Sequence, residues 1–216
     1  MRITLSIARF NPKTDNETHL KDYVVEWEQH ESVLDLVLKV WQQDPGLSFR
    51  RSCRSTICGS CAMFIEDRPR LACQTLVKDL AADGGSLTLK PLPGFRQLKD
   101  LVVDLEPFFE ALKRVIPWML TIPGHKGLVS PEAARQAESP ATCILCSVCD
   151  AGTGSRGNVT PAALVKNMRM AVDPRDALGN QRLKIAGLSA EGLQTFSELL
   201  ANICPKKIEI PVVAQE

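Results

Sequence analysis

Alternating apolar and polar residues predict β-strands in the first part of the chain. Ile3, Leu5 and Ile7 alternate with polar neighbours, and residues 23–27 repeat the pattern. An alternation with a period of two places the apolar side chains on one face of a strand. The polar residues 11–21 lie between the two runs and suit a hairpin connection. We therefore expect two antiparallel strands at the start of the chain.

The next segment has the pattern of a buried helix. Ser32 stands three residues before Asp35, a spacing typical of a capping box at a helix start. Apolar residues then dominate positions 33–41 until the Pro45-Gly46 pair, which does not continue a helix. We expect one helix here, with most of its surface inside the domain.

Two short apolar runs predict further strands. They occupy residues 70–72 and 86–90, and the second is bounded by an Asp-Gly-Gly sequence and by prolines. Strands around a single helix define a small α+β domain, which we assign to residues 1–98.

After residues 93–94 the strand signals fade and helical patterns replace them. Ser130 and Thr160 each precede a proline, which puts a favoured N-cap before a proline at the first helical position. Residues 150–158 are rich in glycine and follow three cysteines, so we interpret them as a loop at a site. We predict an all-α domain over residues 99–216. Its expected helices cover residues 106–120, 131–137, 161–172 and 190–200.

The composition is that of an ordinary folded protein and excludes several function classes. Of the 216 residues, 44% are apolar and 24% are charged, and the net charge is +1. A disordered chain is therefore excluded, and nothing points to a nucleic-acid partner. The alternating start is not a signal peptide, and no stretch approaches the roughly 18 apolar residues of a membrane span. We expect a cytoplasmic protein with reduced thiols and no direct membrane insertion, associated with a membrane only through partner subunits.

Eight cysteines carry the candidate chemistry, in two sets of four. The first set is Cys53, Cys58, Cys61 and Cys73, with the spacing C-x4-C-x2-C and then eleven residues before the fourth cysteine. This spacing is typical of a plant-type ferredoxin loop that binds a 2Fe-2S cluster. Gly59 lets the chain pass close to the cluster, and loop amides can donate to its sulfur atoms. A zinc site is the alternative, although zinc sites usually pair two C-x2-4-C knuckles. Three arginines add positive charge beside this loop: Arg50, Arg51 and Arg54.

The second set lies in the helical half. Cys143, Cys146 and Cys149 form a C-x2-C-x2-C run, and Cys204 precedes Pro205 far downstream. The arrangement is similar to the bacterial 4Fe-4S run, in which the cysteine before a proline comes from a distance. The alternative for Cys204 is a buried apolar residue, because free cysteine is among the most buried residue types. The use of all eight cysteines in two complete sets favours the metal interpretation.

Other constellations are weak. His19, His30 and His125 share no ligand spacing, so we interpret them as solvated or capping residues. The sequence has no nucleophile or nucleotide-loop motif, and we assign no catalytic residue to this chain. We interpret Trp118 and the apolar residues 112–120 as core, with a docking surface as the alternative.

A series of motifs covers nearly the whole chain. They lie at residues 49–54, 58–63, 68–73, 99–109, 143–146, 161–164, 173–176 and 204–206. Together they resemble the iron-sulfur subunit of succinate dehydrogenase and fumarate reductase. The resemblance implies an α+β fold, with an N-terminal β-grasp domain like that of plant-type ferredoxins followed by an all-α helical ferredoxin domain.

The resemblance also implies cofactors and a partner. It places a 2Fe-2S cluster on the first four cysteines and a 4Fe-4S cluster on the second four, and it puts FAD and a dicarboxylate site in a partner flavoprotein subunit. The chain would then be the electron-transfer subunit of an oxidoreductase. It would carry electrons between that FAD and an external acceptor or donor, which can be a further electron-transfer or membrane-anchor protein.

The sequence departs from the family pattern at three ligand positions. Family members usually hold a third cluster, of the 3Fe-4S type, near a quinone site. The positions that match its cysteine ligands are Thr153, Gln194 and Leu200 here. The family also has a serine and a tryptophan pair that line the quinone pocket, and that segment is shortened to residues 154–158 here. We expect no 3Fe-4S cluster and an acceptor other than a quinone in the usual pocket.

A milder departure lies in the first cysteine loop, and two other functions remain open. Ser55-Thr56 stands where the family often has Glu-Gly, which changes the surroundings of the first cluster. The same fold could serve a flavoprotein that acts on a different substrate, because fold similarity does not choose among substrates. The chain could also be a zinc-stapled interaction module without a redox role.

Overall fold

The computed structural model describes residues 1–153, 160–186 and 190–209. Contacts divide the chain into two compact units. The first consists of Met1–Leu105 and Cys146–Gly152, and the second of Glu106–Leu145 and Thr153–Glu216. The predicted domain limits, residues 1–98 for a 2Fe-2S domain and 99–216 for a 4Fe-4S domain, stay a prediction.

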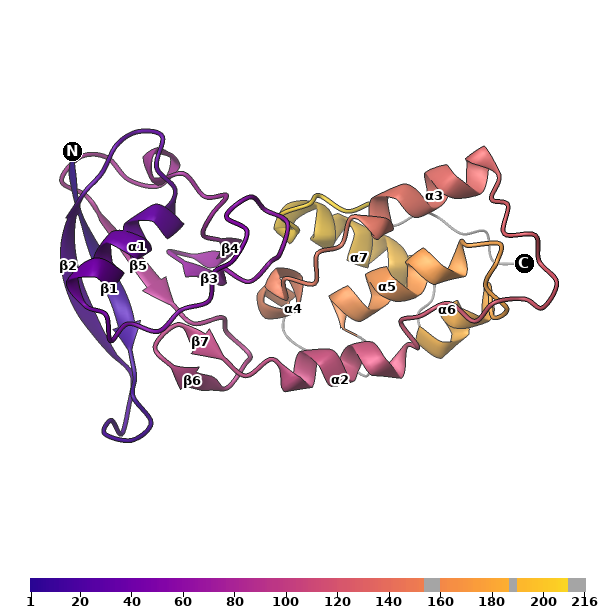
Figure 1. Ribbon diagram of the computed structural model, residues 1–216, viewed down its shortest axis with the longest axis horizontal. Coiled ribbons are helices and arrows are strands. Elements are labelled where there is room, and N and C mark those ends of the chain that lie inside the picture. Colours follow the sequence, from indigo (N-terminus) through magenta and orange to yellow (C-terminus); the bar gives the residue numbers. More distant parts are fainter. Residues whose placement is uncertain (154–159, 187–189, 210–216) are drawn as a thin grey trace. The chain divides into compact units, whose positions relative to one another are not determined.

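The first unit is built on a mixed sheet (Figure 1). Its strands are β1 (Arg2–Arg9), β2 (His19–Glu26), β3 (Ala62–Ile65), β4 (Arg68–Leu71) and β5 (Ser86–Lys90), in the order β2-β1-β5-β3-β4. The predicted hairpin is confirmed, because β1 and β2 pair antiparallel from Arg2 opposite Glu26 to Arg9 opposite His19. β1 pairs with β5 in parallel, and β3 pairs antiparallel with both β4 and β5. The alternation in β1 buries Ile3, Leu5 and Ile7 as predicted.

Helix α1 (Val33–Gln43) follows β2 in this unit, as the capping pattern predicts. The Ser32 hydroxyl accepts a hydrogen bond from the Asp35 amide, and the Asp35 carboxylate accepts one from the Ser32 amide. The pair satisfies two backbone donors that would otherwise lack a partner. The apolar stripe of α1 is fully enclosed in the unit; it consists of Val33, Leu34, Leu36, Val37 and Val40.

Additional short elements correct the prediction that strand structure ends near residue 94. β6 (Gln97–Lys99) and β7 (Val102–Val103) form a two-stranded sheet, and a 3-10 turn covers Val77–Asp79. Asp100 lies between β6 and β7 with a φ of 45°. Its carboxylate accepts hydrogen bonds from the Arg9 guanidinium at 2.9 Å and from the amides of Phe10 and Ser48 at 3.0 and 2.8 Å. The buried Asp100 therefore fixes the chain just before the first cysteine loop.

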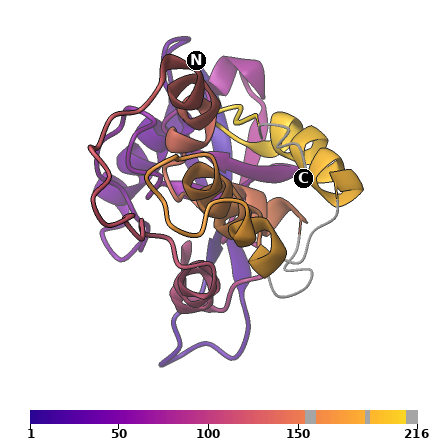
Figure 2. The same ribbon diagram turned by 90° about the vertical axis from the view of Figure 1, so that its right-hand side faces the viewer.

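The rest of the described chain is mainly helical, which confirms the α+β class. Its helices are α2 (Glu106–Arg114), α3 (Pro131–Ala141), α4 (Val148–Thr153), α5 (Pro161–Ala171), α6 (Gln181–Ala186) and α7 (Ala190–Ile203). α5 is the central helix of the second unit, since it contacts α2, α3 and α6 (Figure 2). Its residues Leu164 and Met168 are fully buried, and the N-cap Thr160 accepts a hydrogen bond from the Ala163 amide.

Several predicted helix and core assignments need correction. α2 ends at Arg114 instead of residue 120, because Ile116 adopts a φ of 50° and Pro117 has no amide hydrogen to continue the helix. Trp118 is 55% exposed and does not belong to the core. Residues 150–158 were expected to form a loop, but α4 continues through Thr153, and residues 154–159 lie outside the described residues.

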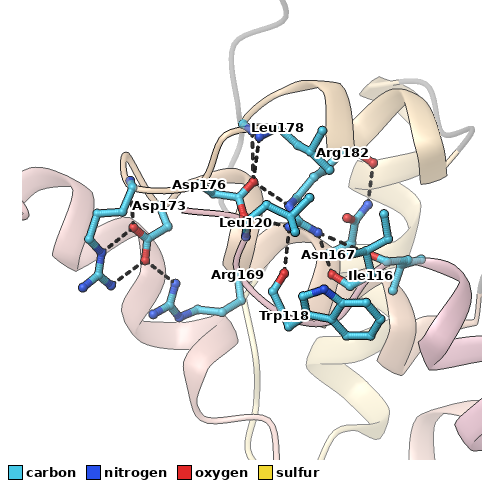
Figure 3. A network of polar contacts seen from close by, with 12 residues as sticks. Ile116, Trp118, Leu120, Asn167, Arg169, Asp173, Asp176, Leu178 and Arg182 are labelled. Carbon is cyan, nitrogen blue, oxygen red and sulfur yellow. Dashed lines mark hydrogen bonds and ion pairs between the residues drawn. The ribbon is translucent and has the colours of Figure 1, made fainter. Parts of the chain in front are cut away.

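A buried ion pair organises the second unit (Figure 3). The side chains of Arg182 and Asp176 have no exposed surface, and the guanidinium donates to both carboxylate oxygens at 2.8 and 2.7 Å. Arg182 also donates to the backbone oxygens of Val115, Ile116 and Trp118 at 3.2, 2.7 and 2.9 Å. One arginine therefore fixes the irregular segment that follows α2.

The Asp176 carboxylate of this ion pair also binds backbone amides. It accepts hydrogen bonds from the amides of Leu120, Leu178 and Gly179 at 3.0, 3.0 and 3.2 Å. Burial opposes its ionisation, but the bonds from Arg182 and these amides outweigh burial and hold the pKa of Asp176 below its ordinary value.

No helix in the described part of the chain is both long and apolar enough to span a membrane.

Candidate metal centres

The first cysteine loop turns its backbone amides toward sulfur. The amides of Ser55, Ile57 and Cys58 donate to Cys53 Sγ at 3.3, 3.4 and 3.2 Å, and the Cys53 amide lies 3.4 Å from Cys58 Sγ. This geometry requires left-handed residues in the loop. Arg54, Thr56 and Gly59 have φ values of 58°, 57° and 70°. Alternating left-handed residues produce a concave set of amides that favours a negatively charged group.

The other two cysteines of this set come from the hairpin of β3 and β4. Cys61 directly precedes β3 and Cys73 follows β4, and the pairing of Ala62 with Leu71 brings the two cysteines to one end of the hairpin. The Ala72 amide donates to the Cys61 backbone oxygen at 3.2 Å. The structure thus brings together a tight loop and a remote cysteine, as the spacing predicts.

Two of the four thiols, those of Cys58 and Cys61, have opposite environments. Burial opposes ionisation of Cys58, but hydrogen bonds from Ser60 and the Cys53 amide outweigh it and lower the pKa of the Cys58 thiol to about 6. Burial raises the pKa of the Cys61 thiol to about 12, although the Cys73 amide acts in the opposite direction; the side chains of Cys73 and Cys58 add to the effect of burial. Cys61 is the buried thiol of the set, whereas Cys53, Cys58 and Cys73 are half-buried.

This donor set fits a 2Fe-2S cluster. Such a cluster has two irons, each of which takes two cysteine thiolates, and its sulfur atoms accept hydrogen bonds from backbone amides. The four cysteines of this set supply the thiolates, and the loop supplies backbone amides that donate to sulfur. Among the described residues, no three His, Cys, Asp or Glu side chains converge on a single metal-ion position.

Two side-chain hydroxyls add to the loop, and the spacing argument did not find them. Ser60 Oγ lies 3.1 Å from Cys58 Sγ, and Thr56 Oγ1 lies 3.9 Å from Cys73 Sγ. Thr56 lies between Cys53 and Cys58, and Ser60 lies between Cys58 and Cys61. A hydroxyl residue between two ligand cysteines is the only sequence signal that could have identified them.

The three arginines flank the loop without bonding to the thiols. Arg51 and Arg54 are exposed and Arg50 is half-buried. The Arg51 guanidinium lies 5.5 Å from the ring centroid of Trp41, within the range of a cation–π interaction. Ile57, at the outer side of the loop, is 67% exposed. The loop thus presents apolar and positively charged side chains to its surroundings.

The second cysteine set is distributed over α4, the loop before it and the end of α7. By contacts, Cys146 and Cys149 belong to the first unit and Cys143 and Cys204 to the second, so their joint use as ligands stays a prediction. Cys149 is buried and the other three are half-buried.

The loop that holds three of these cysteines repeats a feature of the first loop. Leu145 and Ser147 adopt φ values of 53° and 59°, again alternating left-handed residues between cysteines. Near the fourth cysteine, Lys207 also has a positive φ, of 49°. Repeated left-handed residues turn backbone amides toward one side of a loop, which suits an anionic cluster.

The three positions that the sequence analysis matched to 3Fe-4S ligands of the family differ in burial. Thr153 is half-buried at the end of α4, and Gln194 is exposed on α7, where its side chain donates to Glu198 at 3.4 Å. Leu200 is fully buried. None of these side chains supplies a thiol. The three histidines are all exposed: His19, His30 and His125.

Comparison with known proteins identifies the family. The chain is 31% identical to the fumarate reductase iron-sulfur subunit of Haemophilus influenzae, over 96% of this chain and 88% of that protein. It is 32% identical to the succinate dehydrogenase iron-sulfur subunit of Coxiella burnetii, over 95% of this chain and 91% of that protein. The chain belongs to the family of succinate dehydrogenase and fumarate reductase iron-sulfur subunits. The predicted resemblance is thereby confirmed.

Domain and fold comparisons agree with this family. The model of a 2Fe-2S iron-sulfur cluster binding domain matches residues 4–110, which include the first cysteine set. A chain of the Mycobacterium smegmatis Sdh1 complex in its apo form has the same fold, with a TM-score of 0.80 at 22% identity, over 97% of this chain and 90% of that one. The likeness of fold to that chain therefore extends over both units of the present chain.

Proposed function

We propose that this chain is the iron-sulfur electron-transfer subunit of a flavoenzyme of the succinate dehydrogenase and fumarate reductase type. The observation that carries the proposal is the amide-lined loop that gathers Cys53, Cys58, Cys61 and Cys73. Membership of a family whose members are named as iron-sulfur subunits supports the same role. When bound, the clusters accept and release single electrons between the FAD of a partner flavoprotein subunit and an external acceptor or donor.

The ligand assignment is part of the proposal. The 2Fe-2S cluster is held by Cys53, Cys58, Cys61 and Cys73. The 4Fe-4S cluster is held by Cys143, Cys146, Cys149 and Cys204, supported by the left-handed residues of that loop. No 3Fe-4S cluster forms, because residues 153, 194 and 200 are not cysteines.

Partners and location follow from these roles. The dicarboxylate site lies in the flavoprotein subunit, and the chain works in the cytoplasm, associated with a membrane only through other subunits. A flavoprotein with a different substrate is the second candidate. It is favoured by the remodelled ligand positions at Thr153 and Gln194, because a changed acceptor end is compatible with a changed reaction.

Metal analysis combined with electron paramagnetic resonance tests the proposal. We expect about six irons per chain in anaerobically purified protein, from one 2Fe-2S and one 4Fe-4S cluster. The reduced protein should show two separate paramagnetic signals. A colourless protein that contains zinc would overturn the electron-transfer function, whereas a stoichiometric oxidised 3Fe-4S signal would overturn only the cluster assignment.

A further inference from the structure

Thr56 occupies a backbone conformation that its side chain disfavours. Its φ of 57° lies in the left-handed region, which is rare for β-branched residues because Cβ crowds the backbone. Glycine adopts this conformation without that cost, as Gly59 does in the same loop with a φ of 70°. A strained residue beside a proposed cluster requires a compensating interaction.

The side chain of Thr56 makes such an interaction with the remote cysteine. Its hydroxyl oxygen lies 3.9 Å from Cys73 Sγ, although the two residues are 17 positions apart. Both residues are half-buried, so water competes only in part for the hydroxyl and the sulfur. The left-handed turn at residue 56 is what directs the hydroxyl away from the loop backbone and toward the cysteine that follows β4.

The contact also brings a hydrogen-bond donor to the fourth cysteine of the set. Cys53 receives three loop amides, Cys58 receives the Cys53 amide and the Ser60 hydroxyl, and Cys61 receives the Cys73 amide. Among the contacts that the structure describes, the Thr56 hydroxyl is the group that can donate to Cys73 Sγ. Thr56 thereby extends sulfur hydrogen bonding to the fourth cysteine of the set.

We propose that Thr56 is a positioning residue whose hydroxyl donates a hydrogen bond to the Cys73 thiolate and raises the reduction potential of the 2Fe-2S cluster. The inference rests on the proposed function. Reduction adds one electron to the cluster, and the hydroxyl proton remains on Thr56. Because a donor stabilises the more negative reduced form more than the oxidised form, the hydrogen bond favours reduction.

Three variants of the full chain separate the hydroxyl from the backbone strain. Thr56→Val removes the hydroxyl and keeps the β-branched shape, Thr56→Ser keeps the hydroxyl, and Thr56→Gly removes both the hydroxyl and the strain. Thr75→Val is the matched control, since the Thr75 hydroxyl donates to the Leu71 backbone oxygen at 2.9 Å.

The readout is the midpoint potential of the 2Fe-2S cluster, followed by visible absorption during an anaerobic redox titration. We expect Thr56→Val and Thr56→Gly to shift the potential in the negative direction, and the potentials of Thr56→Ser and Thr75→Val to stay near that of the unmodified chain. Resonance Raman spectra in H2O and D2O provide a second measurement, because the deuterium shift of an iron–cysteine stretch should disappear in the valine and glycine variants. Thr56→Gly should also melt at a higher temperature than Thr56→Val.

The outcomes distinguish this inference from the proposed function. A red-brown protein in which the valine and glycine variants have unchanged potentials overturns the role of Thr56 and leaves the electron-transfer function intact. A colourless unmodified chain that contains zinc overturns both. If Thr56→Val does not assemble a cluster, the glycine variant, which fits the backbone, still decides the question.

Discussion

At the scale of single residues, buried charge in this protein is used to fix irregular backbone. Arg182 is enclosed completely, which is costly for a cation unless its donors are satisfied. It satisfies them with the two oxygens of Asp176 and with three backbone oxygens of a segment that has no regular structure. The exposed Trp118 owes its fixed place to this backbone anchoring and not to burial of its ring.

Replacement of Arg182 should therefore strongly destabilise the chain. Arg182→Met leaves the Asp176 carboxylate without its counter-ion in a buried site, and the loss of one partner of such a pair costs about 3–5 kcal/mol of unfolding free energy. Denaturant unfolding measures the difference. Arg135→Ala is the control, because the Arg135–Glu132 pair is about two-thirds exposed and screened by solvent, so its loss should change the unfolding free energy far less. Equal losses in the two variants would contradict the anchoring role.

The cysteine assignment makes a second prediction at this scale. Cys204→Ala should abolish the 4Fe-4S signal and leave the 2Fe-2S signal intact, because Cys204 belongs to the second unit and the first four cysteines to the other. Iron analysis should fall by about four atoms per chain. Cys73→Ala is the matched variant with the opposite expectation. If Cys204→Ala removes the 2Fe-2S signal and spares the other, the two ligand sets are wrongly divided.

The sequence predicted the residues whose chemistry depends on spacing and missed those that depend on backbone conformation. Cysteines at C-x4-C-x2-C indicate a loop around a small anion, and the structure gathers Cys53, Cys58, Cys61 and Cys73. The hydroxyl contact of Thr56 could not be predicted, because it requires a positive φ that a β-branched residue rarely adopts. For the second set, spacing remains the main argument.

At the scale of elements, the N-terminus of α1 is joined to a segment that is remote in sequence. Ser32 does more than cap α1, because an isolated bridge joins it to Leu76, and the Leu34 amide donates to the Ala72 backbone oxygen at 3.0 Å. The start of α1 is thereby attached to the segment that carries Cys73. A loss of order at this cap should be transmitted to the fourth ligand of the first set.

Ser32→Ala should lower the unfolding free energy by about 1 kcal/mol, the usual cost of a lost N-cap. The substitution removes the acceptor for the Asp35 amide and one half of the capping box. Thermal or denaturant unfolding provides the measurement, and Ser86→Ala, at an exposed strand position, should change stability by less than about 0.5 kcal/mol. A Ser32→Ala variant as stable as the control would show that the cap is redundant.

Element prediction succeeded where the pattern was strong and failed where tertiary contacts decide. The strong alternation of β1 and the capped helix α1 were identified correctly. The two-stranded sheet of β6 and β7 was missed, because its strands are very short and its turn depends on Asp100, whose partners are remote in sequence. Helix α2 was predicted too long, since the apolar stretch continues past Pro117 while the backbone does not.

At the scale of the whole molecule, the positions matched to the family's third cluster distinguish this chain from the family pattern. The relatives are named as subunits of succinate dehydrogenase and fumarate reductase. Electron transfer requires a way out as well as a way in, and the family's third cluster and quinone pocket provide that exit in the usual arrangement. Here Leu200 fills a completely buried position and Gln194 faces solvent, so neither position retains the chemistry of a ligand.

We predict that the assembled complex passes electrons from the 4Fe-4S cluster to a protein or cofactor partner and not to a quinone in the usual pocket. Two changes coincide: the ligand positions are now Thr153, Gln194 and Leu200, and the segment that would bear the tryptophan pair is shortened at residues 154–158. Either change alone could be drift, but together they indicate that the acceptor end was remodelled as a unit.

Steady-state turnover of the complex with its flavoprotein tests this prediction. Soluble one-electron carriers should support turnover, and short-chain quinones should support it poorly. A variant that restores cysteine at the three positions, Thr153→Cys with Gln194→Cys and Leu200→Cys, serves as a comparison for the lost ligands. Efficient quinone reduction by the unmodified complex, blocked by inhibitors of the usual pocket, would refute the prediction, because the 4Fe-4S cluster would then have replaced the missing cluster as the quinone reductant.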